Sequence, residues 1–191
     1  DWINLRGAAN ITINSLCDSA DEVAVAQVIA IGPGRFDTTN SIVPTAEPER
    51  DDTTENQGLR VYRMVVFDVV TRYEGDSSVD GYVVVQWGGS PDICPSFTYT
   101  RIPDKARATT NARGMLFLKD LPSRWISNPD TWLTYAQQYT TNLNAGGDNY
   151  RLMTLSDWFK YDTGAGTAES TWLEREMTIT DLVDEVEASY P

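Results

Sequence analysis

Apolar side chains alternate with polar ones, or form runs of four to eight residues, along much of the chain, which is typical of β-strands. Within 59–73 the apolar side chains fall on both faces, so we expect this strand to be buried on both sides. Strands are predicted over Glu22–Ile31, Leu59–Tyr73, Tyr82–Trp87, Met115–Leu118 and Tyr150–Phe159. The pattern therefore predicts a mainly β fold.

Three segments follow a helical pattern instead. Asn128 and Pro129 form a good helix start, and Thr180 is placed to cap a C-terminal helix over Asp181–Ala188. A short helical turn is also expected around Ser15–Ala20. The apolar residues that share a helix face are Trp132, Tyr135, Ala136 and Tyr139 in the first segment and Leu182, Val183 and Val186 in the last.

The first fifteen residues are more apolar than a solvated tail. We define residues 1–15 as an N-terminal arm, ahead of one β-barrel domain over 16–191 with a long polar loop at 35–58. Ile11 and Ile13 alternate with polar residues, as in a half-buried strand. The arm is expected to pack either on a second copy or on its own barrel, and its contact candidates are Trp2, Ile3, Leu5, Ile11 and Ile13.

The order of strand segments resembles that of a known fold. The segments are Asp21–Val28, Tyr62–Asp76, Val83–Ser90 and Gly114–Lys119, and the match covers about residues 18–120 and the final helix. Together they resemble secreted prokaryotic domains of the netrin-like and tissue-inhibitor-of-metalloproteinase kind. The resemblance implies an OB-type β-barrel with flanking helices, including a C-terminal helix. The animal inhibitors use an N-terminal cysteine where this chain has Asp1, so metalloproteinase inhibition is not implied.

The net charge of the chain makes negatively charged partners improbable. The chain has 28 acidic and 15 basic side chains and a formal net charge of −13, which disfavours nucleic acid and anionic membrane surfaces. Its apolar runs are too short for a membrane span. The start at Asp1 is interpreted as that of a mature exported chain, and Asn10-Ile11-Thr12 is an N-glycosylation sequon at Asn10. We expect a secreted or cell-surface protein.

Cys17 and Cys94 are the only cysteines. In an exported protein they predict one disulfide, which would stabilise the fold by about 4 to 5 kcal/mol on the chain-entropy model. Two buried free thiols are the alternative.

The chain contains no histidine, which excludes histidine-dependent triads and imidazole metal sites. Asp162-Thr163-Gly164 matches the tripeptide of aspartic proteases, but it has no second copy and is preferred as a turn. Structural calcium is the one cofactor considered, with solvated acidic loops as the alternative. Its candidate ligands are Asp76, Asp80, Asp51, Asp52 and Glu55.

These observations favour a non-catalytic extracellular interaction module. Six tryptophans and nine tyrosines exceed the needs of one core and are suited to interfaces. We expect a homo-oligomer or polymer that self-associates as a component of a surface layer, filament or tube, or that binds other extracellular proteins. The alternatives are a monomeric binding or protease-inhibitor-like domain and, more weakly, a carboxylate-dependent hydrolase.

Overall fold

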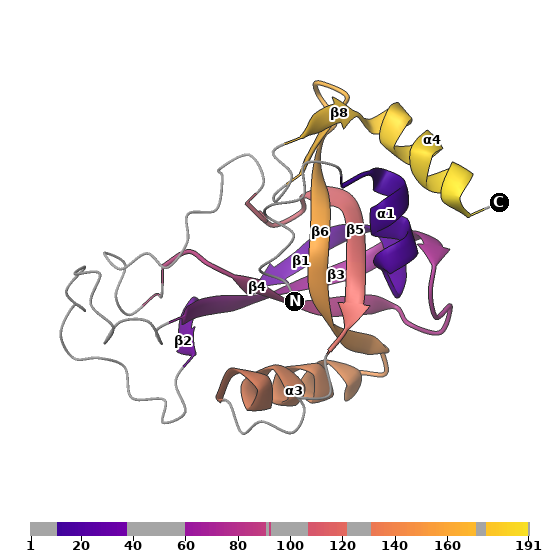
Figure 1. Ribbon diagram of the computed structural model, residues 1–191. Helices are drawn as coiled ribbons and strands as arrows, with labels where there is room; N and C mark the ends of the chain where they lie inside the picture. The colour runs from indigo at the N-terminus through magenta and orange to yellow at the C-terminus, as the bar shows by residue number, and fades with distance from the viewer. Residues whose placement is uncertain are drawn as a thin grey trace.

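A computed structural model describes residues 11–37, 60–90, 92, 107–121, 131–170 and 175–190, and the fold is mainly β (Figure 1). The strands are β1 (Glu22–Ile31), β2 (Arg35–Asp37), β3 (Arg60–Glu74), β4 (Gly81–Trp87), β5 (Arg113–Asp120), β6 (Tyr150–Asp162), β7 (Thr167–Ser170) and β8 (Glu176–Thr178). The helices are α1 (Ile13–Ser19), α3 (Thr131–Asn144) and α4 (Ile179–Ser189). No helix in these ranges is both long enough and apolar enough to cross a lipid bilayer.

Five strands pair in a cycle. β1 pairs with β3 and β5, β3 pairs with β4, and β5 pairs with β6, all antiparallel. A parallel pairing of β4 with β6 completes the cycle. Strand β2 extends one end of β3, while β7 and β8 extend the sheet beyond β6. The sheet therefore closes partly into a ring.

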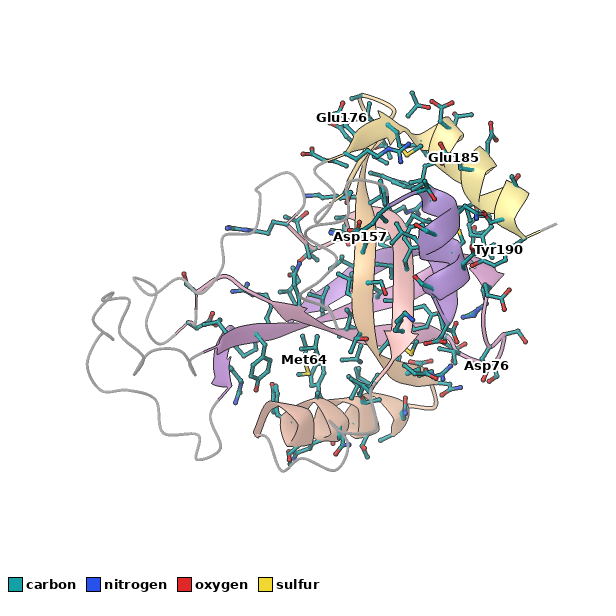
Figure 2. The ribbon with its side chains drawn as sticks, in the orientation of Figure 1. Met64, Asp76, Asp157, Glu176, Glu185 and Tyr190 are labelled. Carbon is teal, nitrogen blue, oxygen red and sulfur yellow. The ribbon has the colours of Figure 1, made fainter. Side chains whose placement is uncertain are left out.

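Strand alternation divides the buried apolar side chains into three clusters. One fills the interior of the ring and includes Phe67 and Trp158, whose rings contact edge to face at 5.6 Å. The second lies between the outer face of the ring and the helices α1 and α4, and the third lies between the outer face and α3, where Met64 is found (Figure 2). Figure 1 shows α1 and α4 together on one side of the strands and α3 on the opposite side. The ring is thus packed inside and on two outer faces.

The strand predictions are confirmed with shifts of a few residues at their ends. β1 has the predicted bounds. β3 is buried on both faces from Val61 to Phe67, apart from the half-buried Arg63, because alternate residues enter the interior and the α3 clusters, whereas residues 68–74 are half-buried or exposed. The strands that extend furthest beyond their predicted bounds are β5 and β6. The C-terminal helix is also confirmed.

Three local predictions were wrong. Ile13 belongs to α1 and not to a strand, because Thr12 forms a reciprocal capping box with Ser15 that starts the helix there. The C-terminal helix starts at Ile179, and Thr178 caps it in place of Thr180 by accepting a hydrogen bond from the Asp181 backbone N–H. The polar loop at 35–58 begins with β2, which pairs with β3. Asn128 and Pro129, predicted to start α3, lie outside the described residues.

Candidate functional site

Each strand of the cycle places one polar residue on the inner face at the same end of the ring. Strand register places Glu22 opposite Leu118, Arg72 opposite Ala24 and Asp120 opposite Met153, all three of which line the interior. Tyr82 belongs to the interior cluster, and Arg151 is two residues before Met153 on β6. We call Glu22, Arg72, Tyr82, Asp120 and Arg151 the Glu22 network.

Glu22 is the centre of this network and its side chain is fully buried. Its carboxylate accepts hydrogen bonds from the Tyr82 hydroxyl at 2.6 Å, the Asp76 backbone N–H at 3.1 Å and the Arg151 guanidinium at 2.8 Å. The second terminal nitrogen of Arg151 donates to Asp120 at 2.6 Å. Burial and the hydrogen bond to Glu22 both raise the pKa of Tyr82, so this phenol stays protonated and donates. The buried charge is therefore compensated by partners from three separate parts of the chain.

The turn between β3 and β4 covers the network. Arg72 donates to the backbone carbonyls of Asp76 at 2.8 Å and Val79 at 2.6 Å. Gly75 has a φ of +116°, and a Cβ atom there would clash with Oε2 of Glu22. Only glycine allows the turn to approach the carboxylate this closely. The hydrogen bonds of the Glu22 carboxylate join β1 to β4, to β6 and to the turn after β3. The network therefore holds these parts of the ring together.

The two described calcium candidates, Asp76 and Asp80, lie in this turn. Asp76 Oδ1 accepts hydrogen bonds from the backbone N–H and the hydroxyl of Ser78, and these bonds lower the pKa of Asp76. Asp80 Oδ2 accepts from the Asn149 backbone N–H at 2.8 Å. Within the described ranges, no three acidic or cysteine side chains are grouped as metal ligands. Asp51, Asp52 and Glu55 lie outside these ranges, and calcium binding stays a prediction.

A second buried acid, Asp157, lies on β6 well away from Asp76 (Figure 2). It accepts hydrogen bonds from the Ser170 hydroxyl at 2.7 Å and the Trp158 backbone N–H at 2.8 Å. Asp157 is paired with Phe117 of the outer cluster, whereas Glu22 faces the interior. Residues paired across strands share a face, so the two buried acids point to opposite faces of the sheet and do not form a carboxylate pair.

The Asp162-Thr163-Gly164 segment forms a turn between β6 and β7. Asp162 Oδ1 accepts hydrogen bonds from the backbone N–H groups of Gly164 and Ala165, both at 3.0 Å. These bonds are those of an aspartate that stabilises its own turn, as the sequence favoured.

Cys17 lies on α1 and is buried in the cluster that α1 shares with α4. It forms no disulfide with another described residue. Its backbone carbonyl accepts a hydrogen bond from the hydroxyl of Tyr190, which lies at the end of α4 (Figure 2). Burial raises the pKa of the Cys17 thiol. Cys94 lies outside the described residues, as does the sequon residue Asn10, so the disulfide and the glycan stay predictions.

Two of the five predicted arm contacts are described. Ile13 is fully buried by its own chain and Ile11 packs partly against the same cluster. Ile13 is therefore not available to a second copy in this structure. Trp2, Ile3 and Leu5 lie outside the described residues.

One strip of the outer barrel surface has large apolar side chains that are partly exposed to solvent. Ile29 is 38% exposed and Val70 is 47% exposed, and both are extra residues at β-bulges between β1 and β3. Between them lies a polar row in which Gln27 of β1 is paired with Asp68 of β3 on one side and Arg113 of β5 on the other. We call Gln27, Ile29, Asp68, Val70 and Arg113 the β1–β3 strip.

Sequence reasoning missed both features. Glu22 precedes an apolar run and therefore resembles a strand boundary, while Arg151 is 129 positions away along the chain. The strip depends on bulges, which change which residues face outward without changing the hydrophobic pattern. An acid directly before four apolar residues, Val23–Ala26, was the only available signal for the network.

No protein-family model matches the chain, and neither a curated protein nor a solved structure matches it.

Proposed function

We propose that this chain is an exported, non-catalytic interaction module on an OB-type barrel of the netrin-like kind, which self-associates as a component of a surface layer, filament or tube. The observation that carries the proposal is the contrast between buried carboxylates that have hydrogen-bond donors and two large aliphatic side chains that remain exposed on the outer surface. The donors to these carboxylates come from the protein itself, whereas Ile29 and Val70 leave 38% and 47% of their surface exposed. Apolar surface without cover is the feature that a protein partner would remove from water.

The strand pairing supports the OB-type assignment. An OB-fold is a five-stranded, partly open Greek-key barrel, and five strands of this chain pair in a cycle with one parallel closure between β4 and β6. The helices α1 and α4, which pack together on one face, agree with the flanking helices that the netrin-like resemblance implies. Fold likeness alone does not give a function, so the self-association must be tested directly.

Sedimentation velocity over a hundredfold range of protein concentration tests the proposal. We expect the average sedimentation coefficient to rise with concentration as subunits associate. A single monomeric species at every concentration would contradict self-association and would favour a monomeric binding or inhibitor-like domain.

A further inference from the structure

We propose that the β1–β3 strip is a two-fold interface that pairs with the same strip of a second copy. This inference rests on the proposed self-association and names the surface that carries it. The strip lies on the outer face between the part that α1 and α4 cover and the part that α3 covers, and its side chains are described as half-buried or exposed. Figure 1 shows these helices on opposite sides of the strands.

The charges of the strip are complementary to themselves. Gln27 is paired with Asp68 on β3 and with Arg113 on β5, so the two charges lie at one level on either side of β1. A two-fold axis along β1 exchanges the two sides of the strip between facing copies. It therefore brings Arg113 of each copy against Asp68 of the other, and it does so twice.

Both charged groups retain bonding capacity. Arg113 donates from Nε to Gln27 at 3.2 Å, and no hydrogen bond of its terminal nitrogens is found within the described residues. Asp68 Oδ1 accepts from the Tyr150 hydroxyl at 2.8 Å, while Oδ2 has no donor in the described part of the chain. A guanidinium with free terminal donors and a carboxylate with a free oxygen form strong charge-assisted hydrogen bonds when they meet.

The same axis brings apolar groups together. Ile29 lies on β1, next to the axis, so the Ile29 side chains of the two copies would face each other and leave water. A second copy is favoured over an acidic or a basic partner because the strip presents one charge of each sign. The contact is limited to the outer face of a few strands, so we expect a weak and salt-sensitive dimer.

Charge reversal with rescue tests this geometry. Arg113→Glu would face Asp68 of the second copy and is expected to raise the dimer dissociation constant by about tenfold. The double variant Asp68→Lys with Arg113→Glu restores both opposite-charge contacts and is expected to recover the association. Arg175→Glu makes the same change in net charge on the far side of β7 and serves as the matched control. The dissociation constants are measured by sedimentation equilibrium, with thermal unfolding to verify folding.

A cysteine variant tests the axis without changing Asp68, whose bond to Tyr150 could affect folding. Ile29→Cys is expected to give a covalent dimer under mild oxidation, beyond any formed by the wild-type cysteines, whereas Val70→Cys, which lies off the axis, is not. If wild type associates but neither Arg113→Glu weakens it nor Ile29→Cys crosslinks it, the strip assignment is overturned and self-association stands. If wild type remains monomeric throughout, the proposed function and this interface both fail.

Discussion

Charged side chains usually lie on a protein's surface and large aliphatic ones in its core. The Glu22 network places a charged group inside the barrel, whereas the β1–β3 strip places aliphatic side chains on its outer surface. The two exceptions are treated differently. The Glu22 carboxylate has three donors, from β4, β6 and the turn after β3, whereas Ile29 and Val70 are 38% and 47% exposed. A buried charge without partners would prevent folding, but an exposed aliphatic side chain costs the monomer little. The Glu22 carboxylate therefore needs hydrogen-bond donors from its own chain, whereas Ile29 and Val70 can remain exposed until a partner binds.

The comparison also separates stability from association. The network joins β1, β4, β5 and β6 at the end where the parallel pairing begins, so its loss should weaken ring closure. The strip residues belong to no described cluster, so changes at positions other than Asp68, which bonds to Tyr150, should leave the fold intact. Variants of the two regions should therefore differ in which measurement they alter.

The largest effect is expected for Glu22→Leu, which removes the acceptor of Tyr82, Asp76 and Arg151 together. Breaking a buried ion pair from one side is expected to lower the free energy of unfolding by about 3 kcal/mol. Urea unfolding followed by tryptophan fluorescence measures the change. Asp120→Asn is the matched control because it removes the other carboxylate of the same arginine, at a side chain that is 57% exposed. That exposed contact is expected to contribute about 0.5 kcal/mol, and equal losses in both variants would contradict the central role of Glu22.

The next effect concerns the approach of the turn to the network. Gly75→Ala requires a positive φ and a Cβ atom at the Glu22 carboxylate, and we expect it to cost about 2 kcal/mol of stability. Gly147→Ala separates the two causes, since Gly147 has a φ of +96° and no atom within 4 Å of its Cβ position. It should cost about 1 kcal/mol from backbone strain alone. If both substitutions cost the same in urea unfolding, close contact with Glu22 does not constrain the turn.

Much of the strand layout could be predicted from the sequence because burial leaves a local alternation. Residues from Met64 to Phe67 alternate between two different clusters, and that pattern can be recognised without knowing which strands lie beside it. The short strands β7 and β8 were not predicted, since three or four residues such as Glu176–Thr178 carry no periodic signal. Helix starts were shifted for a related reason: Thr178 and Thr180 are equally good caps by residue type, and only tertiary packing selects one.

The candidate sites could be predicted far less well. The network depends on Glu22 meeting Arg151 through strand pairing, and a single sequence does not give register between distant strands. The strip depends on bulges at Ile29 and Val70, where one extra residue turns a side chain outward within an otherwise buried pattern. Asp76 and Asp80 were recognised as neighbours in a turn, but their hydrogen bonds to Ser78 and Asn149 required the structure.

A smaller effect on stability is expected in the strip. Ile29→Ser should lower the free energy of unfolding by no more than about 1 kcal/mol, because more than a third of the residue is already exposed to water. Val28→Ser is the matched control one residue earlier, at a side chain that is fully buried in the interior cluster. It should cost about 2 to 3 kcal/mol through lost burial and a buried hydroxyl. Thermal unfolding at low protein concentration, where association is absent, gives both values, and similar losses would show that Ile29 belongs to the core.

The smallest effect concerns Asp76 in the turn over the network. Hydrogen bonds from Ser78 hold the pKa of Asp76 below its ordinary value of 3.8, so the folded state favours the charged carboxylate. The stabilisation from these bonds is complete above that ordinary value and is lost as the pH falls through the lowered pKa. Ser78→Ala removes the hydroxyl bond and keeps the backbone bond, so the pKa of Asp76 should rise part of the way toward 3.8. Carboxyl-detected NMR titration measures this pKa, with Ser77→Ala as the control beside it. An unchanged pKa in Ser78→Ala would show that the Ser78 backbone N–H and the nearby charges of Arg151 and Arg72 lower the pKa of Asp76 without help from the hydroxyl.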